Sequence, residues 1–165
     1  PRSSSAASDV YKRQTKIPNA VLHTNDSNRF EARHVNLKVN SSNKSFFLDK
    51  YETDQVLAIP NAHAEGKLIL DKDKLTEIES NNQVAFRYCN SEGSLEAGYP
   101  WNPNGAPNDI AGITNSRGNV LGMMPHPERV FHGWQHTDWT STGKNPEGPG
   151  DGRALFEGVV EFLCK

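Results

Sequence analysis

Two prolines on either side of one histidine constrain the backbone more than any other feature of this sequence. Pro125 and Pro127 each fix their own φ angle and push the residue before them toward an extended conformation. The run 119–124 has the apolar tendency of a buried strand, so the prolines are predicted to stand at its carboxyl end. Residues two apart in an extended chain point to the same side, so Glu128 can reach a ring nitrogen of His126.

The spacing of His126 and Glu128 is compatible with two roles. A carboxylate that fixes the tautomer of a histidine and stabilises its protonated form supplies the base and its orienting group in a nucleophilic triad. A structural pair that caps the next helix has the same spacing, and spacing alone favours that structural role. Cys89 and Cys164 both lack the strand–tight turn–helix surroundings of a catalytic cysteine, so neither is predicted to be the nucleophile.

The composition limits the classes of function. A chain of 165 residues fits one domain and can bury a core. A formal net charge of −2, with 23% charged residues, gives no electrostatic reason to expect nucleic acid or an anionic membrane as a partner. No apolar stretch is long enough to span a bilayer. Two cysteines form neither a disulfide framework nor a metal-ligand spacing, so a cytoplasmic location is predicted.

The chain is predicted to be one domain behind a short leader. Residues 1–14 are small and polar without periodicity, so we expect a non-native or disordered leader, followed by a domain over 15–165. Asp71 is expected to cap a helix over 72–79, and Asp151 is expected to cap an amphipathic final helix. Strands are predicted over 30–39, 45–48, 55–59, 67–70, 84–88, 110–114 and 119–124.

A second His-x-Glu pair, His63 and Glu65, follows a predicted strand. With His126 and Glu128 it would offer four ligands from two extended segments, which makes a metal-dependent hydrolase one alternative. The other interpretation is that His63 and Glu65 hydrogen-bond a loop at the sheet edge. Nothing in the spacing selects a metal, because the usual helical or paired-cysteine signatures are absent.

Six segments, in this order, resemble one family: 18–22, 25–33, 62–66, 99–105, 109–113 and 122–129. The set is similar to the glutaminase subunit, or C-terminal glutaminase domain, of phosphoribosylformylglycinamidine (FGAM) synthase in purine biosynthesis. The last segment alone suggests triad glutamine amidotransferases in general, and the ordered set is more specific. The resemblance covers about residues 15–165.

The resemblance implies an α/β fold, a flavodoxin-like class I glutamine amidotransferase sandwich, of which this chain is the incomplete C-terminal part. In that family a cysteine attacks the side-chain amide of glutamine, and the ammonia that is released passes to a synthetase active site. Carried over by motif, His126 is the base that activates the cysteine, and Glu128 orients His126. Ser27, Arg29 and Phe30 fall in the stretch expected to line the glutamine pocket.

The resemblance also implies partners. The substrate is glutamine, and the partner is an FGAM synthetase subunit or domain that uses ATP and Mg²⁺, joined by a small third subunit where the glutaminase is separate. No cofactor or metal is expected in the glutaminase domain itself, and no nucleic acid or membrane is expected as a partner.

Two departures from the family pattern affect these expectations. The family's cysteine elbow lies upstream of anything in this sequence, so the nucleophilic cysteine is absent and the chain alone is predicted not to hydrolyse glutamine. Ala64 stands where the family usually has glycine, so the backbone freedom there is expected to differ. A non-catalytic, amidotransferase-like docking module remains an alternative to the enzyme.

Overall fold

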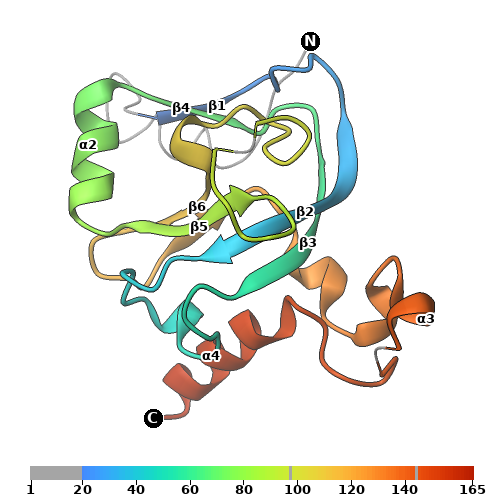
Figure 1. Ribbon diagram of the computed structural model, residues 1–165. Coiled ribbons are helices and arrows are strands. Elements are labelled where there is room, and N and C mark those ends of the chain that lie inside the picture. Colours follow the sequence, from blue (N-terminus) through green and yellow to red (C-terminus); the bar gives the residue numbers. More distant parts are fainter. Residues whose placement is uncertain (1–19, 97, 144) are drawn as a thin grey trace.

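The computed structural model describes residues 20–96, 98–143 and 145–165 (Figure 1). The predicted leader, residues 1–14, lies outside the described residues. In chain order the elements are β1 (Ala20–His23), β2 (Glu31–Val39), η1 (Phe46–Leu48), β3 (Val56–His63), β4 (Lys67–Leu70), α2 (Lys72–Ser80), β5 (Val84–Cys89), η2 (Pro107–Asp109), β6 (Ile110–Thr114), β7 (Leu121–Met123), η3 (Pro127–Val130), η4 (Gly133–Gln135), α3 (Trp139–Thr142) and α4 (Arg153–Leu163), where η marks a 3-10 helix.

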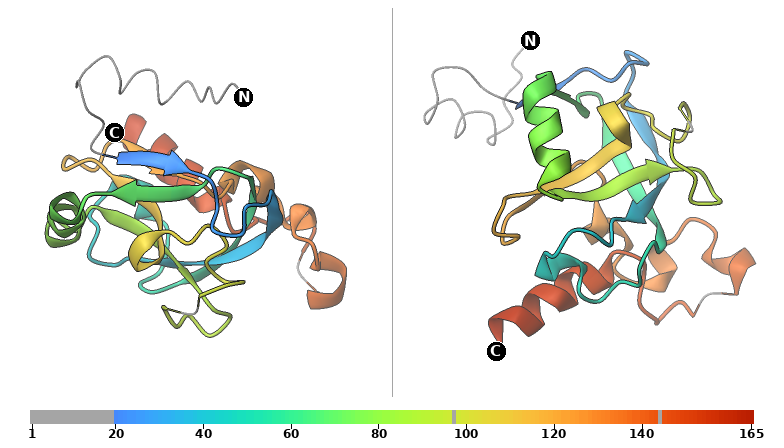
Figure 2. Two further views of the ribbon diagram at one scale, coloured as in Figure 1. Left: turned by 90° about the horizontal axis from the view of Figure 1, so that it is seen from above. Right: turned by 60° about the vertical axis from the view of Figure 1, so that its left-hand side comes forward.

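Two antiparallel sheets organise these elements. Five strands form the main sheet in the order β3-β2-β5-β6-β7, and β1 pairs with β4 in a separate ribbon. The ribbon lies on one side of the main sheet and α4 on the other (Figures 1 and 2). The main sheet curls, and its two edges are joined by the chain that leaves β7. This chain reaches β3, where the His126 amide donates to the Pro60 carbonyl over 2.7 Å.

The core follows from alternation along the strands. Val35 and Leu37 of β2 are buried, and they share one face with Leu57 and Ile59 of their register partner β3. The same hydrophobic cluster includes Val130 of η3 and Leu155 of α4, and β5 contributes two aromatic side chains, Phe86 and Tyr88. The segment that carries His126 and Glu128 is therefore backed directly by the core.

Three local predictions differ from the structure. Residues 45–48 were expected to form a strand, but Phe46–Leu48 is a 3-10 helix with Ser45 as its N-cap. The strand predicted over 55–59 does not stop before Pro60, since β3 runs from Val56 to His63. The reason is position, because β3 is an edge strand and the N–H that proline lacks is not needed for pairing with β2. The predicted cap of α4 is also wrong: Gly152 is the N-cap, and the Asp151 carboxylate accepts from the Ala58 amide over 2.8 Å instead.

The predicted polar helix is confirmed as α2, where the Asp71 carboxylate accepts from the Lys74 amide over 2.9 Å. The last helix, α4, carries apolar side chains on its exposed side: Val160, Phe162 and Leu163 are 60%, 50% and 74% exposed. Among the helices of the described residues, none is long and apolar enough to cross a membrane.

Candidate active site

The structure brings His126 and Glu128 together at the start of η3. His126 Nδ1 lies 2.8 Å from Glu128 Oε1, and Arg129 Nε lies 3.8 Å from the same oxygen. A carboxylate only accepts hydrogen bonds, so Nδ1 of the neutral imidazole carries the hydrogen and Nε2 is left as the basic nitrogen. Pro125 and Pro127 are buried, while the His126 side chain stays 29% exposed. The pair can therefore take up a proton from a group that approaches His126.

His63 ends β3 and is held as a neutral, buried histidine. Its Nε2 lies 2.9 Å from Asn104 Oδ1, and Asn104 Nδ2 donates to the Tyr88 hydroxyl over 2.7 Å. Burial lowers the pKa of His63; the hydrogen bond to Asn104 opposes this effect, and the charge of His126 lowers the pKa further. Asn104 is fully buried, so the loop 98–106 contributes the centre of a polar network beside the sheet.

The two His-x-Glu pairs do not converge on one ion site. Glu65 is exposed, whereas the His63 ring is engaged with Asn104. Over residues 20–96, 98–143 and 145–165, there is no group of three or more histidine, cysteine, aspartate or glutamate side chains placed to hold a metal ion. The geometry of the described residues thus lends no support to a metal-dependent hydrolase.

The predicted glutamine-pocket residues lie in the loop that precedes β2. Asn25 ties this loop to β3, since its Nδ2 donates to the His63 carbonyl over 2.8 Å and to the Arg29 carbonyl over 3.0 Å. Ser27 is half-buried, and its Oγ has no hydrogen-bond partner among the described residues. The Arg29 side chain is exposed, and Phe30 is 63% exposed. The loop lies at the His63 end of β3, three residues beyond Pro60, the acceptor of the His126 amide.

Ala64 does not need the freedom of glycine in this chain. It is absent from the residues with positive φ, so its backbone is in a region open to any amino acid. Close packing is required two residues later, where a Cβ built on Gly66 would lie 2.0 Å from His63 Nε2. The family's glycine pattern is thus kept where the backbone lies against the histidine ring.

Neither cysteine has the surroundings of an activated nucleophile. Cys89 is buried in β5, and burial raises the pKa of its thiol to about 11, so at neutral pH it is a thiol and not a thiolate. Cys164 is exposed at the end of α4. Both cysteines are free.

The sequence patterns did not single out two features that the structure shows. Asn25 and Asn104 are buried hubs, and no local spacing marks a buried asparagine. A second histidine–carboxylate pair joins His136 Nδ1 to Asp138 Oδ1, and the His136 ring lies 5.4 Å from the His34 ring. Its His-x-Asp spacing matches that of His126 and Glu128, and this is the signal that could have revealed it.

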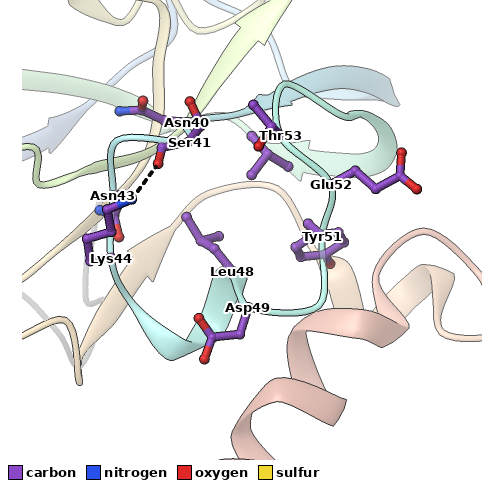
Figure 3. Close-up of a pocket in the computed structure, with 10 residues that line it drawn as sticks. Asn40, Ser41, Asn43, Lys44, Leu48, Asp49, Tyr51, Glu52 and Thr53 are labelled. Carbon is purple, nitrogen blue, oxygen red and sulfur yellow. Dashed lines mark hydrogen bonds between the residues drawn. The ribbon is translucent and has the colours of Figure 1, made fainter.

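A small hollow of about 190 Å³ lies in the loop that follows β2 and includes Asn40, Leu48 and Tyr51 in its lining (Figure 3). It contains neither His126 nor Glu128. The candidate site is therefore defined by the histidine–glutamate pair, not by this pocket.

The chain is similar to known glutamine amidotransferases. A family model of the CobB/CobQ-like glutamine amidotransferase domain matches residues 8–163. Phosphoribosylformylglycinamidine synthase subunit PurQ of Archaeoglobus fulgidus is 45% identical over 161 residues, which cover 95% of this chain and 56% of that protein. The protein of the same name from Picrophilus torridus is 44% identical over 114 residues, 69% of this chain and 44% of that protein. The chain thus spans about half the length of the curated relatives it matches.

The structure of PurLQS from Thermotoga maritima supports the same assignment. It matches with a TM-score of 0.61 at 28% sequence identity, over 87% of this chain and 53% of that chain. This match confirms the predicted class I glutamine amidotransferase fold, and the family predicted from the ordered motifs is confirmed as well. The chain belongs to the CobB/CobQ-like glutamine amidotransferase domain family.

Proposed function

We propose that this chain carries the base and the orienting carboxylate of the glutaminase of FGAM synthase in purine biosynthesis. The observation that supports it most is the 2.8 Å contact between His126 Nδ1 and Glu128 Oε1 in a chain whose relatives are named as subunits of that synthase. The contact leaves Nε2 of His126 as a base, which is the arrangement that activates a nucleophile.

The proposed reaction needs a nucleophilic cysteine, and neither Cys89 nor Cys164 has the surroundings of one. His126 takes the proton of the cysteine thiol as the sulfur bonds to the amide carbon of glutamine. His126 then gives that proton to the leaving nitrogen, so ammonia departs and a glutamyl thioester remains. Water attacks the thioester, the thiol is regenerated, and glutamate is released. Glu128 keeps His126 in the required tautomer and stabilises the imidazolium that forms in between.

The ammonia serves an ATP- and Mg²⁺-dependent synthetase partner, which converts formylglycinamide ribonucleotide into its amidine. Ser27, Arg29 and Phe30 are proposed to line the glutamine side of the pocket, since their loop is tied to β3 beside the polar network of His63. We place this activity in the cytoplasm, where free thiols such as those of the two cysteines persist.

A chimera tests the proposal. The part of Archaeoglobus fulgidus PurQ that this chain does not span would be joined to residues 15–165, and glutamate release would be measured. The chimera is expected to hydrolyse glutamine, and Glu128→Gln should lower kcat by about 10²–10⁴-fold because the tautomer of His126 is lost. Asp138→Asn, which alters the second histidine–carboxylate pair, is the matched control and should leave kcat unchanged.

Two results would count against the enzyme. A chimera that folds and still releases no glutamate, or one whose rate is insensitive to Glu128→Gln, would favour a docking module. The chain alone is expected to release no glutamate, since Cys89 is buried and Cys164 lies at the end of α4.

A further inference from the structure

The segment 150–152 packs directly against η3, the 3-10 helix that holds Glu128. The Gly152 amide donates to the Val130 carbonyl over 3.1 Å, and the Gly150 amide donates to the Phe131 carbonyl over 2.9 Å. Both carbonyls belong to the stretch that begins at His126. Two backbone hydrogen bonds therefore join the start of α4 to the segment that carries the histidine–glutamate pair.

Gly152 is required by close approach and not by its own backbone angles. Its φ is −84° and its ψ is −14°, which any amino acid can adopt. A Cβ built there, however, would lie 2.0 Å from the Pro127 carbonyl oxygen and 2.8 Å from Pro127 Cα. Both are backbone atoms, and they belong to the residue between His126 and Glu128. A side chain at 152 would have to displace the peptide that sets the distance between the pair.

Asp151 ties the same segment to the outer edge of β3. Its Oδ2 accepts from the Ala58 amide over 2.8 Å, and its backbone carbonyl accepts from the Tyr51 hydroxyl over 3.1 Å. Two residues along that edge, the Pro60 carbonyl accepts from the His126 amide over 2.7 Å. The outer edge of β3 thus holds His126 directly, and through Asp151 it holds the segment that packs against Pro127.

We propose that Asp151 and Gly152 are positioning residues for the His126–Glu128 pair. They act through η3 and not by contact with substrate. Their effect on the geometry of the pair is independent of the proposed function, and only their effect on catalysis rests on it. A Cβ at 152 would have to move the Pro127 carbonyl by about 1.4 Å or more to reach an ordinary contact, which a hydrogen bond of 2.8 Å does not tolerate. Loss of the Asp151 anchor would free the segment from β3.

The test is the tautomer of His126, read from long-range ¹H–¹⁵N correlation spectra of the ¹⁵N-labelled chain. The pH is kept above the ordinary histidine pKa, and the signal is assigned by its loss in His126→Gln. Wild type is expected to show the Nδ1–H pattern that the Glu128 contact imposes. Gly152→Ala and Asp151→Ala should lose that pattern and show the Nε2–H pattern. This readout needs no glutaminase activity, so it can fail or succeed independently of the proposed function.

Two variants separate positioning from general strain. Gly158→Ala also presses α4 onto a backbone carbonyl, since its Cβ would lie 2.6 Å from the Phe46 oxygen, but this carbonyl belongs to η1 and not to η3. It should keep the Nδ1–H pattern. Asp151→Asn retains an oxygen acceptor for the Ala58 amide and should also keep it. If Gly152→Ala does not fold, Asp151→Ala and Asp151→Asn decide alone. The proposal is overturned if folded Asp151→Ala, or folded Gly152→Ala, retains the wild-type pattern.

Discussion

Acid should destabilise this protein through His63, and His63→Gln should remove that part of its pH dependence. The His63 ring is buried, its Nε2 donates to Asn104, and the backbone of Gly66 lies against it so closely that a Cβ there would be 2.0 Å from Nε2. A protonated ring would bring a charge into this space. Glutamine keeps a nitrogen donor for Asn104 without a titratable group.

The sign of the effect follows from the causes of the pKa shift. Burial lowers the pKa of His63 from its ordinary 6.5; the Asn104 hydrogen bond opposes the shift, and the charge of His126 adds to it. Below 6.5 the unfolded chain binds a proton at His63 that the folded chain does not, so the free energy of unfolding falls as the pH falls. The loss is at most about 1.4 kcal/mol per pH unit and stops once the pH passes below the folded-state pKa.

The measurement is urea unfolding of wild type and His63→Gln over a pH series from neutral to mildly acidic. The free-energy difference between the two proteins isolates His63, because the other titrating groups are shared. Wild type should lose stability relative to the variant below 6.5. In thermal melts, each kcal/mol should appear as about 2–4 °C in Tm for a chain of this size. His23→Gln, at an exposed position, is the matched control for removing a histidine.

The outcome that contradicts this reasoning is a free-energy difference that does not change with pH. Such a result would mean that His63 takes up a proton as readily in the folded chain as in the unfolded one. The ring would then not be confined to its neutral form by burial, and the network around Asn104 would not depend on it.

Further predictions concern the same network and the thiols. Asn104→Ala should lower the free energy of unfolding by about 2–6 kcal/mol, since it leaves the His63 and Tyr88 polar groups without their buried partner. A loss of unfolding free energy well below that range, measured by urea unfolding, would contradict the role of Asn104 as the centre of the polar network. Gly66→Ala should lower stability by about 1–3 kcal/mol through overpacking on the same histidine, and a thermal melt equal to wild type would refute the close approach. A thiol reagent should modify only Cys164 in the native chain, as mass spectrometry would show, and both cysteines after unfolding.

The strands that could be predicted are those whose alternating apolar side chains meet an apolar face on a neighbouring strand. Alternation over 30–39 became β2, because Val35 and Leu37 meet an apolar face on β3. Pro60 was misjudged because its effect depends on whether β3 lies inside the sheet or at its edge, and only the complete sheet decides that. Asp151 was misjudged for a similar reason. An aspartate before a helix is a cap by local rules, and here Gly152 is the N-cap while the Asp151 carboxylate accepts from a strand amide.

The sequence by itself predicted the pairing of His126 with Glu128, because Pro127 between them restricts its own φ angle and the conformation of His126. The ordered motifs also predicted the family, because a motif is recognised from its residues in sequence order and does not depend on how the chain packs. Only the tertiary structure decided what surrounds the pair. The Asn104–His63 contact joins residues 41 positions apart, and the Asp151–Ala58 contact joins residues 93 positions apart. Such contacts depend on how the sheet curls and on how closely distant backbone segments approach each other. The local spacing of residues predicts neither.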